Sequence, residues 1–174
     1  TGYAQSEDFS SSGLADTSFT YVYNAGSTDS IPLGAYANDQ YGLFVAQYTS
    51  SGQLIWAKRQ SRDYFTWGSF PVRMGLCADN SLVILSKGSG QVKWDGTACT
   101  SGSCCNPHFA LLKLDSLGNR LWCLEDGNFV DYMDMGIDSA DNIYITLPTA
   151  WTGGDDEAFL RKYSPGGNLL WNTP

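Results

Sequence analysis

The stretch Phe159-Leu-Arg-Lys-Tyr-Ser-Pro-Gly-Gly-Asn-Leu-Leu-Trp171 joins two short runs rich in apolar residues through a small polar turn that contains glycine. The same pattern occurs twice upstream, from Phe44 to Trp56 and from Phe109 to Trp122. Two such runs flanking a glycine-containing turn are typical of a β-hairpin. The sequence therefore predicts three copies of one hairpin.

A second pattern precedes each hairpin, namely a glycine, a short polar turn and an alternating apolar run. Its glycines are Gly13, Gly75 and Gly136, which lie 62 and 61 residues apart, whereas the hairpin tryptophans lie 66 and 49 residues apart. Strands and turns repeated at this spacing predict one supersecondary unit copied three times. The other positions expected to be equivalent in the three copies are Phe44, Phe109 and Phe159, and Trp56, Trp122 and Trp171.

The third copy divides most clearly into strands. We expect strands at 135–138, 143–147, 158–163 and 168–171, separated by turns and one loop. Four short antiparallel strands in so regular a unit are typical of a β-propeller blade. The predicted fold is all-β, with three four-stranded antiparallel propeller-type blades in an open partial propeller that assembly completes. We expect a single domain over residues 1–174, with repeats at about 13–56, 75–122 and 136–171 after a linking segment at 1–12.

The residues of the third copy carry a family resemblance. Phe159 to Trp171, together with the stretch Gly136-Ile-Asp-Ser-Ala-Asp-Asn-Ile-Tyr-Ile-Thr146, resembles the bacterial-type, seven-bladed β-propeller repeat family, and the match extends over about residues 13–171. The first copy departs from the family's Asp-x-x-Gly-Asn turn, and the second has His108 in place of an Asp. The tryptophan-containing repeat of quinone-dependent dehydrogenase propellers is the alternative, but its glycine and tryptophan usage differs. The resemblance implies a propeller fold and no catalytic residue, because propellers host unrelated functions.

Three repeats are fewer than the roughly four to eight blades that usually close a propeller. The alternatives are a six-bladed ring of two chains, an open head-to-tail filament, or a segment of a longer chain. We expect a homo-oligomer or polymer in which the terminal repeats bury apolar faces. Phe9 and Asn172 are expected near the junction between chains, because the segment around Phe9 resembles the link between repeats at 125–129.

Composition limits the classes of partner. The chain of 174 residues has a formal charge of −8 and a pI near 4.3, which opposes nucleic-acid binding because that requires Lys and Arg to neutralise phosphates. No run approaches the roughly 20 apolar residues of a membrane-spanning helix. The opening residues lack a signal peptide's basic start and apolar core, as expected for a processed chain or an excised segment.

A disulfide expected among the five cysteines indicates an oxidising compartment, and thus an extracellular protein. Cys99, Cys104 and Cys105 lie in one polar loop, so we expect Cys99 to pair with Cys104 or Cys105. Cys77 and Cys123 are expected on the first and last strands of one repeat, about 14 Å apart and beyond a disulfide's reach. The spacing does not match a zinc site. Serines at 10–12 and 27–30 are candidates for O-linked sugar.

Several aromatic residues are candidates for contact with a glycan or a partner. Four lie in the long link at 58–73, where aromatic side chains and arginines are typical of binding surfaces. Their alternative role is to fill the gap between the first two repeats. The candidates are Tyr64, Phe65, Trp67, Phe70 and Trp151.

The sequence gives little indication of a metal site or a catalytic site. Asp131, Asp134, Asp138 and Asp141 offer oxygen ligands for calcium, but their spacing fits ordinary turns equally well. His108, the only histidine, lacks a nucleophile motif beside it. We therefore expect no catalytic residue, metal or cofactor. The predicted function is that of a non-enzymatic extracellular structural unit of a filament, coat or adhesive surface; the alternatives are a glycan-binding, lectin-like module and, last, a hydrolase.

Overall fold

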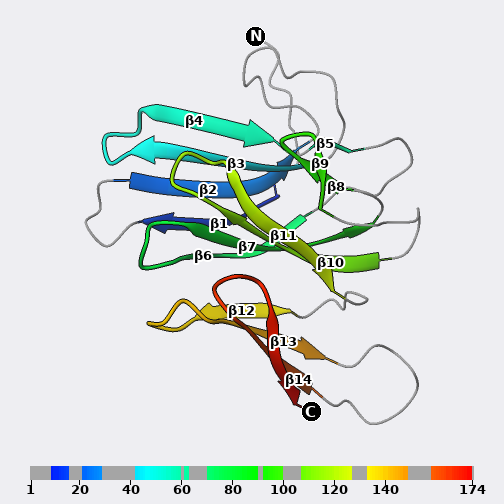
Figure 1. The fold of residues 1–174 in the computed structure, drawn as a ribbon. Coiled ribbons are helices and arrows are strands. Elements are labelled where there is room, and N and C mark those ends of the chain that lie inside the picture. The colour runs from blue at the N-terminus through cyan, green and yellow to red at the C-terminus, as the bar shows by residue number, and fades with distance from the viewer. Residues whose placement is uncertain are drawn as a thin grey trace.

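The computed structural model describes residues 9–15, 21–28, 42–59, 61–62, 70–89, 92–99, 107–126, 133–148 and 158–173. These residues form antiparallel β-sheets, and none of them supplies a helix long and apolar enough to cross a membrane. The predicted all-β class is confirmed. Figure 1 shows three main sheets that follow one another along the chain.

Each main sheet has four strands, and neighbouring strands are consecutive apart from one inserted hairpin. The first sheet contains β1 (Phe9–Ala15), β2 (Tyr21–Thr28), β3 (Gly42–Thr49) and β4 (Leu54–Arg59). The second contains β6 (Phe70–Leu76), β7 (Leu82–Ser89), β10 (Pro107–Leu114) and β11 (Arg120–Asp126). The third contains β12 (Asp134–Ile137), β13 (Ile143–Pro148), β14 (Ala158–Tyr163) and β15 (Leu169–Thr173). A small sheet joins β5 (Ser61–Arg62), β8 (Val92–Trp94) and β9 (Thr97–Ala98).

Two strands begin earlier in the chain than the sequence predicts. β1 begins at Phe9, inside the segment expected to be a link, and β6 begins at Phe70, inside the long link between repeats. The segment Phe9–Ser12 has no alternating apolar pattern, so local sequence does not reveal it as a strand. It becomes one because its backbone pairs with β2.

Five turns within the sheets share one hydrogen-bonding pattern. In each, the amide of the first residue donates to the carbonyl of the fifth, and the amide of the fourth donates to the carbonyl of the first. Asp115 reinforces its turn by accepting from the Leu117 and Asn119 amides at 2.9 and 2.8 Å. This geometry explains the Asp-x-x-Gly-Asn pattern, because the fourth position adopts a positive φ, as Gly118 does at 76°.

The first strands of the three sheets lie side by side. β6 contacts β1 on one side and β12 on the other (Figure 1). Arg73 on β6 donates to the Asp134 carboxylate on β12 at 2.7 Å. Gly75 lies at this close approach, because a Cβ at that position would be 2.5 Å from Ile137 Cδ1.

The core lies between the sheets, and the second sheet is buried on both faces. Leu82 and Ile84 of β7 face the first sheet, whereas the alternate residues Val83 and Leu85 face the third. β10 alternates in the same way. A strand buried on both faces is apolar at successive positions, which explains the uninterrupted run at 82–85.

Candidate functional site

One cross-strand row recurs in all three sheets and ends in a tryptophan; we call it the tryptophan row. The paired positions are Tyr23, Gln47 and Trp56 in the first sheet, Val83, Lys113 and Trp122 in the second, and Tyr144, Lys162 and Trp171 in the third. A β-bulge follows the same turn in each sheet and precedes each tryptophan. The three tryptophans therefore have the same backbone register.

The first junction, between the first and second sheets, places Trp56 on a turn of the second sheet. The Trp56 indole N–H donates to the Ser116 carbonyl at 3.1 Å. The ring lies over Gly118, where a Cβ would be 2.9 Å from it. Lys58 adds a hydrogen bond of 2.9 Å to the Asn119 side chain. The turn therefore presents a carbonyl and a flat glycine surface to the tryptophan of the preceding sheet.

The second junction, between the second and third sheets, repeats this contact. The Trp122 indole N–H donates to the Pro165 carbonyl at 3.0 Å, and a Cβ on Gly167 would lie 3.2 Å from the ring. Lys113, which is buried, donates from Nζ to the same carbonyl at 3.3 Å. Both junctions thus join a tryptophan of one sheet to a glycine turn of the next.

The outward face of the third sheet carries the same row without a described sheet beyond it. Trp171 is 38% exposed and packs edge-on against Tyr144, with 6.0 Å between ring centroids. Lys162 lies 4.9 Å from the centre of the Tyr144 ring and 3.8 Å from the Asp138 carboxylate. This face is mixed in polarity, not the apolar face that the sequence predicts, because Tyr144 and Asp138 stand where the second sheet has Val83 and Cys77.

The turn at 49–53 in the first sheet is the counterpart of the two turns that receive tryptophans. It has the same backbone hydrogen bonds, and Gly52 has a φ of 81°, close to the 76° of Gly118. Residues 50–53 are exposed, and no described atom lies within 4 Å of a Cβ built on Gly52. This turn is therefore open to a contact from outside the sheet.

Two residues expected to occupy equivalent positions in the three repeats, Gly13 and Phe109, are shifted by one residue from that register. Leu14, not Gly13, has the register of Gly75 and Gly136, since Leu14 pairs with Tyr23 of the tryptophan row. Phe109 likewise lies one position further from its turn than Phe44 and Phe159 do from theirs. A shift of one residue in a strand reverses the face.

The disulfide differs from the predicted one. Cys99 pairs with Cys123, with 5.3 Å between their Cα atoms, so the expected bond to Cys104 or Cys105 is wrong; those two residues lie outside the described part of the chain. The cause is tertiary, since the β8–β9 hairpin brings Cys99 to the outer strand β11. Cys77 is a buried free thiol, and the order β6-β7-β10-β11 keeps it away from Cys123, as expected.

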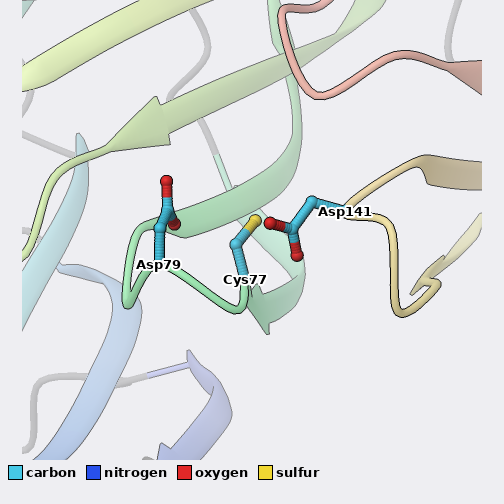
Figure 2. Close-up of side chains that lie close together, drawn as sticks. All are labelled: Cys77, Asp79 and Asp141. Carbon is cyan, nitrogen blue, oxygen red and sulfur yellow. The ribbon is translucent and has the colours of Figure 1, made fainter.

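A cluster of Cys77, Asp79 and Asp141 has potential metal-binding atoms within 4.8 Å of one another. Figure 2 shows the cysteine and Asp79 on one loop and Asp141 approaching from another. Burial raises the pKa of the Cys77 thiol, which opposes the thiolate that a metal requires. Asp141 accepts the Ala78 amide at 2.8 Å, and Asp79 accepts the Ser81 amide and hydroxyl. The cluster therefore holds the turns of the second and third sheets together.

The remaining polar candidates have separate structural partners. Asp134 pairs with Arg73 at 2.7 Å, and Asp138 accepts from the Asn142 amide at 2.9 Å within its own turn. Asp131 lies outside the described residues. His108 is buried with Nδ1 3.4 Å from a Glu125 carboxylate oxygen on the neighbouring strand. The described aspartates of this acidic run, which on sequence alone was weighed against a calcium site, thus serve different contacts.

Most of the aromatic contact candidates cannot be placed. Tyr64, Phe65, Trp67 and Trp151 lie outside the described residues. Phe9 and Phe70 lie at the starts of β1 and β6, but their side chains are not among those described. Asn172 is exposed on β15 and accepts from Arg161 Nε at 3.3 Å.

Trp94 is a core residue that the repeat pattern does not predict. Its side chain is 1% exposed in the core of the first junction, and its indole N–H donates to the Gly118 carbonyl at 3.3 Å. The available signal was the dipeptide Asp95-Gly96 after Val92-Lys-Trp94, which is typical of a tight hairpin. Asp95 and Gly96 both have positive φ, as such a turn requires.

No protein-family model and no curated protein sequence matches this chain.

Proposed function

We propose that the chain is a non-enzymatic, extracellular repeat protein whose three main sheets are propeller-type blades, and that it acts as a structural unit by assembling through its end sheets. The observation that carries the proposal is the repeated junction. Trp56 and Trp122 each dock on a glycine turn of the following sheet, while Trp171 and the turn at 49–53 remain exposed. The first and third sheets thus carry the two halves of a contact that the chain makes internally, and such a pair of surfaces is suited to repetition between copies.

Two further observations support this reading. The side-by-side arrangement of β1, β6 and β12 is the one expected of inner strands around a propeller axis. The Cys99–Cys123 disulfide fits an oxidising compartment outside the cell. We include in this proposal a role in a filament, coat or adhesive surface, which assembly and disulfide stabilisation would both serve.

The proposal is tested by measuring mass as a function of concentration. Analytical ultracentrifugation over a series of concentrations should give species heavier than one chain of 19.0 kDa, and their share should rise with concentration. A chain that stays monomeric at the highest concentrations would contradict the proposal.

A second candidate function is glycan binding, and the observation that favours it is the Tyr144–Trp171 pair. The two rings meet edge-on at an exposed sheet face, with Lys162 beside them. Aromatic faces combined with polar groups suit a sugar ring, which has apolar C–H surfaces and hydroxyls. A glycan array with the wild-type chain and Trp171→Ala separates this function from assembly, because only glycan binding gives a specific signal that the substitution removes.

A further inference from the structure

The two internal junctions specify what a tryptophan row needs from its neighbour. Each turn supplies one backbone carbonyl, from Ser116 or Pro165, and a glycine at the fourth position. The glycine is required because the tryptophan ring occupies the space of a Cβ, which would lie 2.9 Å from it at Gly118. A turn of this type therefore matches what Trp171 presents.

The first sheet of the chain carries such a turn. In the turn at 49–53, Ser50 occupies the position of Ser116 and Pro165, and Gly52 has the left-handed conformation of the other two turn glycines. The turn's outer residues are exposed, and the space over Gly52 is open among the described atoms. No acceptor for the Trp171 indole N–H is found within the described part of the chain.

We propose that Trp171 of one copy docks on the turn at 49–53 of a second copy, with its indole N–H donating to the Ser50 carbonyl. This inference rests on the proposed assembly function and names the contact that carries it. Lys162 occupies the position of Lys113, which donates to the corresponding carbonyl at the second junction, so its ammonium group can reach the same acceptor. The contact is heterologous, because a Trp171 edge always meets a 49–53 turn.

We assign a second copy of this chain as the partner that covers Trp171. Trp171 and the turn at 49–53 are both on one chain, and together they match a contact that the chain already makes twice. The mixed face should make this contact weaker than the internal junctions. Tyr144 and Asp138 replace Val83 and Cys77, so the docked surface contains less apolar area than the second junction. Less buried apolar area gives a reversible, concentration-dependent association.

The test uses one variant for each half of the contact. Gly52→Asn keeps a residue that tolerates positive φ but places a side chain where the tryptophan must lie. Trp171→Ala removes the docking ring. The matched control is Gly96→Asn, because Gly96 has a φ of 74° and open space around it but lies in the β8–β9 hairpin. Each docking variant should weaken association roughly thirtyfold, as removal of a central tryptophan does, while the control should associate like wild type.

Mixing the two docking variants gives the decisive result. Gly52→Asn retains a working Trp171 and Trp171→Ala retains a working turn, so an equimolar mixture should form a 1:1 heterodimer that cannot extend. Sedimentation-velocity ultracentrifugation resolves this species from the 19.0 kDa monomer and from longer assemblies.

The other outcomes are distinguishable. Assembly that survives both substitutions would overturn this contact and leave the assembly function standing. Loss of assembly in Trp171→Ala alone, with no heterodimer on mixing, would mean that the tryptophan meets some other surface and would also overturn the contact. A wild-type chain that never associates would overturn both proposals.

Discussion

Trp122 and Trp171 have the same register and the same bulge before them, yet their surroundings differ. Trp122 lies on Gly167 and donates to the Pro165 carbonyl, whereas Trp171 is exposed beside Tyr144. The residues across the sheet differ accordingly, since the apolar Val83 of the second sheet is replaced by Tyr144 in the third. The same strand register therefore places a tryptophan in a contact between sheets or on the surface, depending on whether another sheet packs against that face.

The largest expected effect concerns the first junction, which has a disulfide that the second lacks among the described residues. Replacing both partners, as Cys99→Ser with Cys123→Ser, should lower the free energy of unfolding by about 2–4 kcal/mol, because the bond closes a loop of moderate length. Urea unfolding measures the loss. Peptide mapping by mass spectrometry without reductant should recover the Cys99–Cys123 link, and recovery of Cys99 bound to Cys104 or Cys105 would contradict the structure.

The next effect tests the comparison between the two tryptophans directly. Trp122→Ala should cost about 2–3 kcal/mol, less than a fully buried tryptophan because the ring is only partly buried. Trp171→Ala should cost less than about 1 kcal/mol, measured as a monomer. Trp122→Phe, which keeps an aromatic ring but removes the indole N–H, should have an intermediate cost. Equal costs for the two alanine variants would show that the neighbouring sheet contributes little.

A smaller effect should separate two glycines in equivalent register. Gly75→Ala forces the flexible end of the Ile137 side chain to move and should cost about 1 kcal/mol through overpacking. Gly136→Ala meets no described atom within 4 Å and should change stability by no more than about 0.5 kcal/mol. Thermal unfolding of the two single variants beside wild type is sufficient. A large loss in Gly136→Ala would mean that its side of the third sheet is covered.

The smallest effect concerns Asp138 of the third sheet, which occupies the position that Cys77 has in the second sheet. Hydrogen bonds from Asn142 lower the pKa of the Asp138 carboxyl from 3.8 to about 2, although its partial burial opposes the shift. Because the folded-state pKa is the lower one, the stabilisation is complete above pH 3.8 and is lost as the pH falls towards 2. Asp138→Asn should therefore be less stable than wild type at neutral pH, and the difference should shrink between about pH 4 and 2. A difference that does not change across this range in urea titrations would exclude the carboxylate as its cause.

Local chemistry explains why the sequence predicts the third sheet well. The predicted strands at 143–147 and 158–163 correspond closely to β13 and β14, because alternating apolar residues and short polar turns determine them. The Asp-x-x-Gly-Asn turn is equally local, since Asp115 accepts amides only two and four residues away. These features require no knowledge of the rest of the chain.

The sequence by itself determined the repeat, the turns and the all-β class of this protein. Only the tertiary structure decided that Cys99 bonds to Cys123, that Trp94 fills the first junction, and that Gly75 receives Ile137. Each of these contacts joins segments that are distant in the sequence, so its existence depends on how whole sheets and one inserted hairpin pack. Sheet packing also explains the contrast between Trp122 and Trp171. The nearby sequence sets the register of each tryptophan, whereas the packing of the sheets decides which residues it contacts.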